Sequence, residues 1–182
     1  MTAAGCGLGG SGTKTVTTTR VRTVTVTSTR TVTNSGASTS PCTGSELSGT
    51  FALVAGSQGA GQVAYLLKLT NTSQTRCYVF GLPQAQLLSA AGAALPTHVA
   101  AAQAGASAKP VTLAPGSSAV TQARFSPSVP GPGDAQSGSC QPKASTLRVT
   151  PDGGGTVDAP LQPPTSVCER GTLYFDVFAP AT

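Results

Sequence analysis

Five cysteines are the residues of this chain with the most direct chemistry: Cys6, Cys42, Cys77, Cys140 and Cys168. Four of them follow residue 41, and an even number of cysteines in one small domain predicts two disulfides. Four cysteines allow three pairings. We favour the pairing of neighbours along the chain, Cys42 with Cys77 and Cys140 with Cys168. Closing loops of about 30 residues would stabilise the fold by about 3–4 kcal/mol each in the chain-entropy description.

A metal site is the alternative use of the same cysteines. Structural zinc sites combine closely spaced cysteine pairs with further cysteine or histidine ligands. No two cysteines here have the C-x-x-C spacing, and His98 is the only histidine. We therefore expect no metal and no cofactor. Because disulfides persist in oxidising compartments, the cysteines predict an extracytoplasmic location.

His98 is also the only candidate general base for a hydrolase. It lies in a Pro- and Ala-rich segment that we expect to be an exposed strand end, so a solvated histidine is the favoured interpretation. The six acidic residues show no pairing typical of two-carboxylate hydrolysis. The Gly-rich residues 56–62 lack the lysine of a phosphate-binding loop. We therefore predict no catalytic residues, with a secreted hydrolase that uses His98 as the alternative.

The fifth cysteine, Cys6, follows three small residues in the sequence AAGC. This resembles a bacterial lipobox, in which the cysteine receives lipid chains after signal cleavage. Ala3 stands where lipoboxes usually carry leucine, and the five residues before Cys6 are too few for a signal peptide. We interpret Met1 as a start placed too far downstream or as the beginning of a truncated chain; the alternative is an incidental thiol in a protein that stays inside the cell. If Cys6 is lipidated, its acyl chains would anchor the protein to a membrane. No run of 18 apolar residues is present, so no transmembrane helix competes for this anchoring role.

Residues 13–33, TKTVTTTRVRTVTVTSTRTVT, contain eleven threonines and no acid, aromatic, glycine or proline. Residues 1–41 lack large apolar side chains, so they cannot offset the roughly 1–2 kcal/mol per residue that backbone ordering costs. We predict a disordered tail whose residues 7–41 act as a spacer, either O-glycosylated or bare. Four basic residues give this tail most of the net charge of +5. That charge would attract an anionic membrane or wall polymer.

Residues 42–182 must supply the folded scaffold. Val63, Tyr65, Leu67 and Leu69 fall on one face of a strand, and Tyr174, Asp176 and Phe178 alternate with Leu173, Phe175 and Val177. The Ala-rich stretch around Pro96 is broken by proline and glycines, so no helix is expected. Short strands with turns between them predict an all-β protein, an antiparallel β-sandwich, with a small barrel as the alternative. The expected strands are residues 50–55, 63–70, 76–80, 85–89, 95–99, 111–113, 119–125, 146–150, 156–159 and 172–178.

Five segments carry a resemblance to a known family. They are CTGSEL from Cys42, LLKLTNTSQTRCYVFGLP from Leu66, VTLAPGSSA from Val111, Cys140 with LRVTP from Leu147, and CERGTLYFDVF from Cys168. Their order and chemistry resemble the actinobacterial domain-of-unknown-function family 4232 over residues 42–182. The resemblance implies an immunoglobulin-like β-sandwich, paired cysteines, a secreted protein or lipoprotein, and no established activity. Glu169 and Arg170 stand where a double glycine is expected after the last cysteine.

Loops are the best candidates for binding. FGLP (Phe80, Gly81, Leu82 and Pro83) places an aromatic beside turn residues, and residues 126–139 form a long Pro/Gly-rich loop. We expect a monomeric, noncatalytic binding module of the cell envelope, lipid-anchored through Cys6 or secreted, with an unknown ligand. A purely structural envelope protein is a further alternative. After residue 41 the chain has seven basic and six acidic residues, so no nucleic-acid partner is expected.

Overall fold

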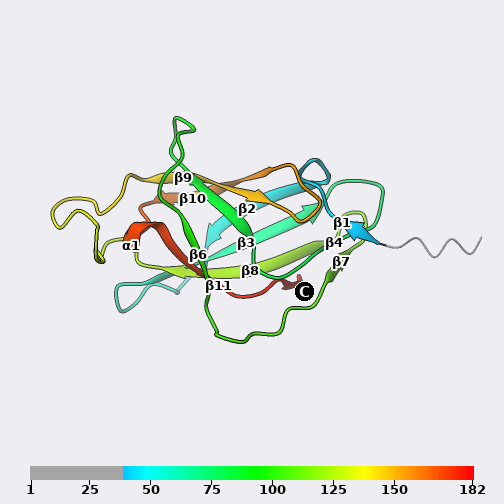
Figure 1. Cartoon of the computed structure of the whole chain (residues 1–182), viewed down its shortest axis with the longest axis horizontal. Coiled ribbons are helices and arrows are strands. Elements are labelled where there is room, and N and C mark those ends of the chain that lie inside the picture. Colours follow the sequence, from blue (N-terminus) through cyan, green and yellow to red (C-terminus); the bar gives the residue numbers. More distant parts are fainter. Residues whose placement is uncertain (1–38) are drawn as a thin grey trace, which may run out of the picture. The chain divides into compact units, whose positions relative to one another are not determined.

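The computed structural model describes residues 39–182, and these residues fold almost entirely as β-structure (Figure 1). Two short helical turns interrupt the strands: η1 (Gly44–Glu46) and α1 (Cys168–Gly171). No helix among the described residues is long and apolar enough to cross a membrane. The strands are β1 (Ser40–Pro41), β2 (Leu47–Leu53), β3 (Val63–Asn71), β4 (Cys77–Val79), β5 (Gln84–Leu88), β6 (His98–Ala101), β7 (Val111–Leu113), β8 (Ser118–Phe125), β9 (Ala144–Thr150), β10 (Val157–Thr165), β11 (Thr172–Phe175) and β12 (Ala179–Pro180).

The strands form one large and one small sheet. The large sheet has the order β5-β9-β10-β2-β3-β8-β11-β6, with β12 also paired to β8. The small sheet, β1-β4-β7, lies at one end of the folded part, and α1 lies at the opposite end (Figure 1). Most pairs are antiparallel, but β1–β4, β10–β2 and β11–β6 are parallel. The predicted all-β sandwich is therefore confirmed, with mixed rather than purely antiparallel pairing.

The large sheet folds back on itself in a barrel-like sandwich. The Leu95 N–H donates to the Leu87 carbonyl of β5 at 2.9 Å, and the chain then enters β6 at the other end of the strand order. Aromatic rings fill the interior that this curvature creates. The ring centroids of Phe51 and Phe175 lie 6.0 Å apart, although two strands separate β2 from β11. The Tyr65 ring packs 5.2 Å from the rings of both Phe51 and Phe125.

Side-chain size explains why β3 and β8 lie at the centre of this core. Val63, Tyr65, Leu67 and Leu69 of β3 are buried, as the alternating pattern predicted, whereas Leu66 between them is 37% exposed. In β8 two of the facing positions are small: Tyr65 pairs with Ala123, and Leu69 pairs with Ala119. Large side chains on one strand and small ones on the next allow the interior to fill without voids.

The last predicted strand, residues 172–178, is too long. Strand β11 ends at Phe175, and the chain returns beside β8 as β12. The Phe178 N–H donates to the Gly81 carbonyl at 3.0 Å, which turns the Phe178 ring inward, so that only 7% of the residue is exposed. Phe178 therefore does not share the outer face of Tyr174, because the strand alternation stops before it.

The predicted strand 156–159 is too short. Strand β10 continues to Thr165 through Pro160, Pro163 and Pro164. Its register with β9 shifts between Pro160 and Thr165, and Leu161 and Gln162 pair instead with β2. Because proline lacks a backbone N–H, it is tolerated where a ladder is interrupted in this way.

The β-structure begins two residues before the domain boundary that was expected at Cys42. Ser40 and Pro41 already form β1 and pair with Cys77 and Tyr78 of β4. Cys6 and the threonine-rich residues 13–33 lie outside the described residues, so the predictions of lipidation, a spacer and a basic tail stay predictions.

Candidate functional site

The four later cysteines form two buried disulfides, one near each end of the fold. Cys42 bonds Cys77, with Cα atoms 4.9 Å apart, and ties the chain after β1 to β4. Cys140 bonds Cys168, with Cα atoms 5.4 Å apart, and ties the loop before β9 to α1. This is the pairing that the sequence favoured. Two such bonds indicate an oxidising environment for the folded protein.

A buried carboxylate accompanies the second disulfide. Asp134 accepts hydrogen bonds from the backbone N–H groups of Gly131 (2.9 Å), Glu169 (2.5 Å) and Arg170 (2.9 Å), and from Gln141 Nε2 (2.9 Å). We call this arrangement the Asp134 clamp. The Gln141 amide, then the Gly131 N–H and the α1 donors, lower the Asp134 pKa to about 2. The clamp fixes the loop 126–139, a candidate for ligand binding, against α1.

The Asp134 clamp explains a departure from the family pattern. Glu169 (φ 53°) and Arg170 (φ 57°) both take the left-handed conformation that glycine adopts most readily. They stand where a double glycine was expected, and their N–H groups are the ones that Asp134 binds. Gly171 follows with φ 79°, and a Cβ there would lie 1.8 Å from the Pro96 carbonyl oxygen. Only the third of these positions strictly requires glycine.

The Asp134 clamp is also the strongest grouping of potential metal ligands among the described residues. One Asp134 oxygen and the sulfurs of Cys140 and Cys168 lie within 4.8 Å of one another. The two sulfurs are bonded to each other, and both carboxylate oxygens accept hydrogen bonds. A metal ligand must offer a free thiolate or an available lone pair. The arrangement therefore fits a structural role.

The predicted ligand loop FGLP surrounds a hollow too small for a ligand. Phe80 is 45% exposed and is not part of the core, Pro83 is buried, and Gly81 and Leu82 lie between these extremes. The hollow beside them has a volume of about 10 Å³, room for about one water molecule. This loop exposes an aromatic ring without a preformed cavity.

His98 lies exposed at the start of β6, as expected for a solvated histidine. It pairs in register with Thr172 and lines an open hollow of about 440 Å³ that Glu169 and Arg170 also border. The Thr172 hydroxyl donates to the Glu169 carbonyl at 2.6 Å. Within residues 39–182 no hydrogen bond links His98 to a hydroxyl or carboxylate, whereas a nucleophile and its base lie about 2.6–3.2 Å apart. The geometry gives no support to hydrolysis through His98.

A second hollow, in two adjoining parts, lies on the outer face of β3, β8, β11 and β6. One part has a volume of about 410 Å³ and is lined by Gln62, Ala102, Gln103, Arg124, Tyr174 and Asp176. A second part, of about 290 Å³, shares Gln62 and Arg124 and extends to Gln122. We call the two parts together the outer groove. Their volumes match those of small-molecule sites, about 300–1,000 Å³.

Strand register brings the outer groove together. Arg124 of β8 pairs with Tyr174 of β11, and both side chains point away from the core. Asp176 follows two residues after Tyr174, and its N–H donates to the Gln122 carbonyl at 2.9 Å. Gln103 follows β6, which runs parallel to β11. The rigid sheet therefore fixes the backbone from which most of these side chains project.

A tight turn places Gln62 at the edge of the outer groove. Gly59 and Gln62 exchange both backbone hydrogen bonds, at 3.1 and 2.9 Å. Between them Ala60 (φ 49°) and Gly61 (φ 76°) have the two positive φ angles of a type I′ turn. The Gly-rich residues 56–62, predicted to be a loop between strands, thus form a hairpin turn that presents an amide to the groove.

The polar side chains of the outer groove have no partners within the described part of the chain. No hydrogen bond or ion pair between residues 39 and 182 engages the side chains of Gln62, Gln103, Gln122, Arg124 or Asp176. Tyr174 is 37% exposed, and its hydroxyl lies 3.5 Å from Glu169 Oε2. Amide and charged groups and one aromatic ring therefore converge on a hollow, and the side chains of Gln62, Gln103, Gln122, Arg124 and Asp176 have no partner there among residues 39–182.

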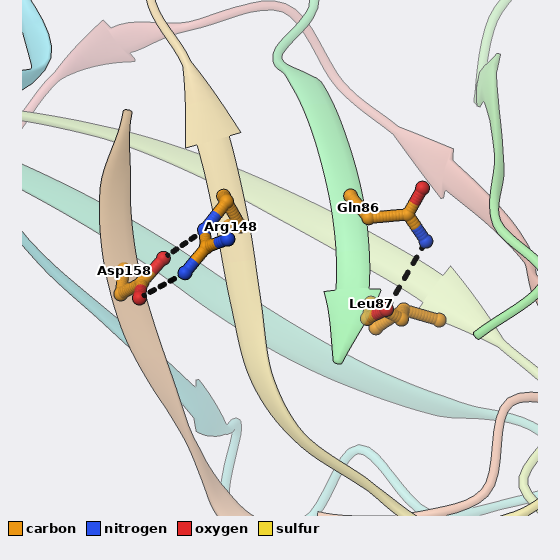
Figure 2. Close-up of polar contacts among 4 residues, drawn as sticks. All are labelled: Gln86, Leu87, Arg148 and Asp158. Carbon is orange, nitrogen blue, oxygen red and sulfur yellow. Dashed lines mark hydrogen bonds and ion pairs between the residues drawn. The ribbon is translucent and has the colours of Figure 1, made fainter. Parts of the chain in front are cut away.

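Some comparable side chains elsewhere on the sheet are paired (Figure 2). On β9 and β10 the Arg148 guanidinium donates two hydrogen bonds to Asp158, at 2.7 and 2.9 Å, and thereby lowers the Asp158 pKa. On β5 the Gln86 amide donates to the Leu87 carbonyl at 3.1 Å and to the Thr97 hydroxyl at 2.9 Å. Arg148, Asp158 and Gln86 are thus satisfied within the fold, whereas the polar side chains of the outer groove are not paired among the described residues.

The sequence analysis did not identify the outer groove. The alternation in residues 172–178 did place Tyr174 and Asp176 on one face, which was a usable signal. Gln62, Gln103 and Arg124 come from three other segments, and only the strand order brings them to the same place. Unlike the FGLP loop, the groove is not marked by any short motif.

The fold and site together define a disulfide-bonded β-sandwich with a polar groove on one outer face. The family model described as Domain of unknown function (DUF4232) matches residues 42–177, and the chain belongs to this family. This confirms the resemblance that the five segments carried. No curated protein and no solved structure matches the chain.

Proposed function

We propose that this protein is a noncatalytic binding module of the cell envelope, held on the extracytoplasmic side by a lipid anchor on Cys6. The observation that carries the binding role is the outer groove, where Gln62, Arg124, Asp176 and their neighbours offer hydrogen bonds that the described residues leave unused. Polar groups that converge on a concave surface are the usual mark of a ligand site.

Three further features support this proposal. The disulfides fit an oxidising compartment outside the cytosol. AAGC at residues 3–6 supplies a cysteine in a lipobox-like context, and the basic residues 14–30 would favour an anionic surface beside it. His98 has no hydroxyl or carboxylate partner among residues 39–182, which favours binding over hydrolysis.

Co-sedimentation of the purified full chain with envelope material stripped of protein and lipid tests the binding role. We expect saturable sedimentation, with no soluble fragments released during long incubation. Absence of sedimentation would contradict the proposal. Release of fragments that His98→Ala abolishes would establish the hydrolase instead.

Fractionation of producing cells tests the anchor separately. The wild-type chain should partition with membranes into a detergent phase and carry fatty acid, whereas Cys6→Ser should leave the membrane fraction while keeping both disulfides. Equal partitioning of the two proteins would remove Cys6 from the proposal and leave the binding role to be judged on its own test.

A further inference from the structure

We propose that the outer groove binds a neutral polysaccharide, with the sugar chain lying along β11. This inference builds on the proposed function by naming the chemical class of the ligand and its site. It concerns residues that neither the family match nor the sequence pattern singled out.

The side chains of the outer groove match the chemistry of a sugar. A pyranose ring presents apolar C–H faces and a rim of hydroxyls that both donate and accept hydrogen bonds. Gln62 and Gln103 supply amides that do both, Arg124 supplies donors, and Asp176 supplies two acceptor oxygens. Tyr174 contributes a partly exposed aromatic ring with an apolar body and a polar tip. Every group a sugar needs is present, and apart from the long contact of the Tyr174 hydroxyl with Glu169 none has a side-chain partner within the described residues.

The charge of the groove favours a neutral ligand. Arg124 and Asp176 are the charged residues that line the larger part, one of each sign, and neither is in an ion pair within the described part of the chain. A polyanion would gain attraction from Arg124 and meet repulsion from Asp176. The basic residues 14–30 of the tail, which include no acidic residue, are better suited than the groove to bind an anion.

The apolar content of the groove argues against a protein partner. Protein interfaces have an apolar centre rich in large side chains. Four large apolar residues are exposed among residues 39–182, namely Leu66, Phe80, Val129 and Tyr174, and only Tyr174 lines the outer groove. One aromatic ring among amides and charges is too little for such a centre but sufficient to pack against one sugar ring.

The direction of the ligand follows from β11. Thr172, Tyr174 and Asp176 project on the same outer side, and two residues of a strand span about 6.6 Å. The Tyr174 hydroxyl lies 3.5 Å from Glu169 Oε2, and Glu169 borders the neighbouring hollow of His98 and Arg170. That hollow continues the polar surface beyond Tyr174, so a chain of several sugars has more contacts than a single one.

Titration of the ¹⁵N-labelled full chain tests the inference. The probes are neutral hexasaccharides of glucose, galactose, mannose, arabinose and N-acetylglucosamine, with polyphosphate as the anionic comparison. We expect at least one neutral hexasaccharide to bind saturably and to shift the amide signals of Gln62, Gln103, Arg124 and Tyr174. Monosaccharides should bind more weakly than the hexasaccharide.

Matched variants identify the surface. Tyr174→Ala and Arg124→Met should each weaken binding at least about tenfold, the effect of removing one well-placed contact. Tyr174→Phe should bind within about threefold of wild type, because the ring rather than the hydroxyl makes the contact. Phe80→Ala, which removes the exposed aromatic of the FGLP loop, should bind as wild type does. Unchanged thermal unfolding of each variant confirms that the fold is intact.

Several outcomes would overturn the inference. Shifts that map to Phe80 and disappear in Phe80→Ala would move the site to FGLP. Binding of polyphosphate but of no neutral hexasaccharide at about millimolar concentration, or binding of neither, would also reject it. If Tyr174→Ala and Arg124→Met co-sediment with stripped envelope material to the same extent as the wild type, the inference fails while the proposed function stands. If neither the wild type nor any variant co-sediments, the proposed function fails.

Discussion

Two aspartates, Asp134 bonded to α1 and Asp176 just after β11, show two different uses of a carboxylate. Asp134, which is 8% exposed, accepts four hydrogen bonds and joins the loop 126–139 to α1. Asp176 lines the outer groove and its carboxylate accepts none within residues 39–182. The first residue holds the chain together, whereas the second faces the surroundings with its bonding capacity unused.

The contrast extends to the residues around each aspartate. Near Asp134 the chain contains a disulfide and three successive left-handed residues, all of which serve to close a loop. Around Asp176 regular strands carry side chains that the fold does not need. We therefore expect substitutions at the α1 end to change stability and substitutions on the outer face to change the proposed binding, so that the two properties can be separated.

The largest effect on the α1 end should come from Gly171→Ala. A Cβ at this position would meet the Pro96 carbonyl, and φ is 79°. We expect a loss of more than about 4 kcal/mol in the free energy of unfolding, or failure to fold. Gly116→Ala is the matched control, because it has the same φ of 79° with nothing within 4 Å of the added methyl group. It should cost only the backbone strain, about 1–2 kcal/mol by urea unfolding. Equal losses in the two variants would mean that the close approach to Pro96 does not matter.

Removal of the second disulfide should have the next largest effect. The double substitution of Cys140 and Cys168 by serine removes a covalent link between residues that are 28 positions apart in the sequence. It should lower the free energy of unfolding by about 3–4 kcal/mol. Urea unfolding without reductant measures this. At temperatures where the variant stays folded, its outer groove should keep the affinity of the wild type. Loss of binding in a folded variant would show that the two regions are coupled.

A smaller, pH-dependent effect should follow from Asp134→Asn. The folded-state pKa of Asp134 is about 2, below its ordinary value of 3.8, because its hydrogen bonds favour the charged form. Its contribution to stability is therefore present above about pH 4 and is lost as the pH falls towards about 2. The difference between wild type and Asp134→Asn in urea midpoint should shrink across this range. A difference that stays constant from pH 6 to pH 2 would contradict the assigned role.

The smallest effect on stability should come from Asp176→Asn. The Asp176 carboxylate has no partner among the described residues, so the urea midpoint at pH 7 should change by no more than experimental error. Its effect should appear in binding to the outer groove instead. A stability loss as large as that of Asp134→Asn would remove the distinction between the two aspartates.

The strands with a regular alternation of side chains were predictable from the sequence. The points at which strands end or change their pairing partner were not. Tyr65 and Leu67 lie inward as the alternation in β3 required, because side chains on a strand alternate with a period of two. Phe178 was predicted to share a face with Tyr174 and Asp176, since nothing local marks the end of β11 at Phe175. The extension of β10 through Pro160 was missed because it depends on an exchange of partner from β9 to β2.

The candidate sites follow the same division. The cysteine pairing was predictable because few alternatives exist and short loops close more easily than long ones. The FGLP loop was chosen for its local composition, yet the hollow beside it has a volume of about 10 Å³. The outer groove was not predictable, since Gln62, Arg124 and Tyr174 share a surface only through pairing of strands that are distant in sequence.

From the sequence by itself came the all-β class, the family, the two disulfides and the oxidising compartment that they imply, because residue type and short-range spacing carry these properties. The tertiary structure alone decided that Glu169 and Arg170 could replace a double glycine, since the carboxylate of Asp134, 35 residues before Glu169, binds the N–H groups of both. It also decided which polar side chains remain unpaired. Whether a hydrogen-bonding group is used within the fold depends on what lies next to it in space, and that depends on the packing of the whole sheet.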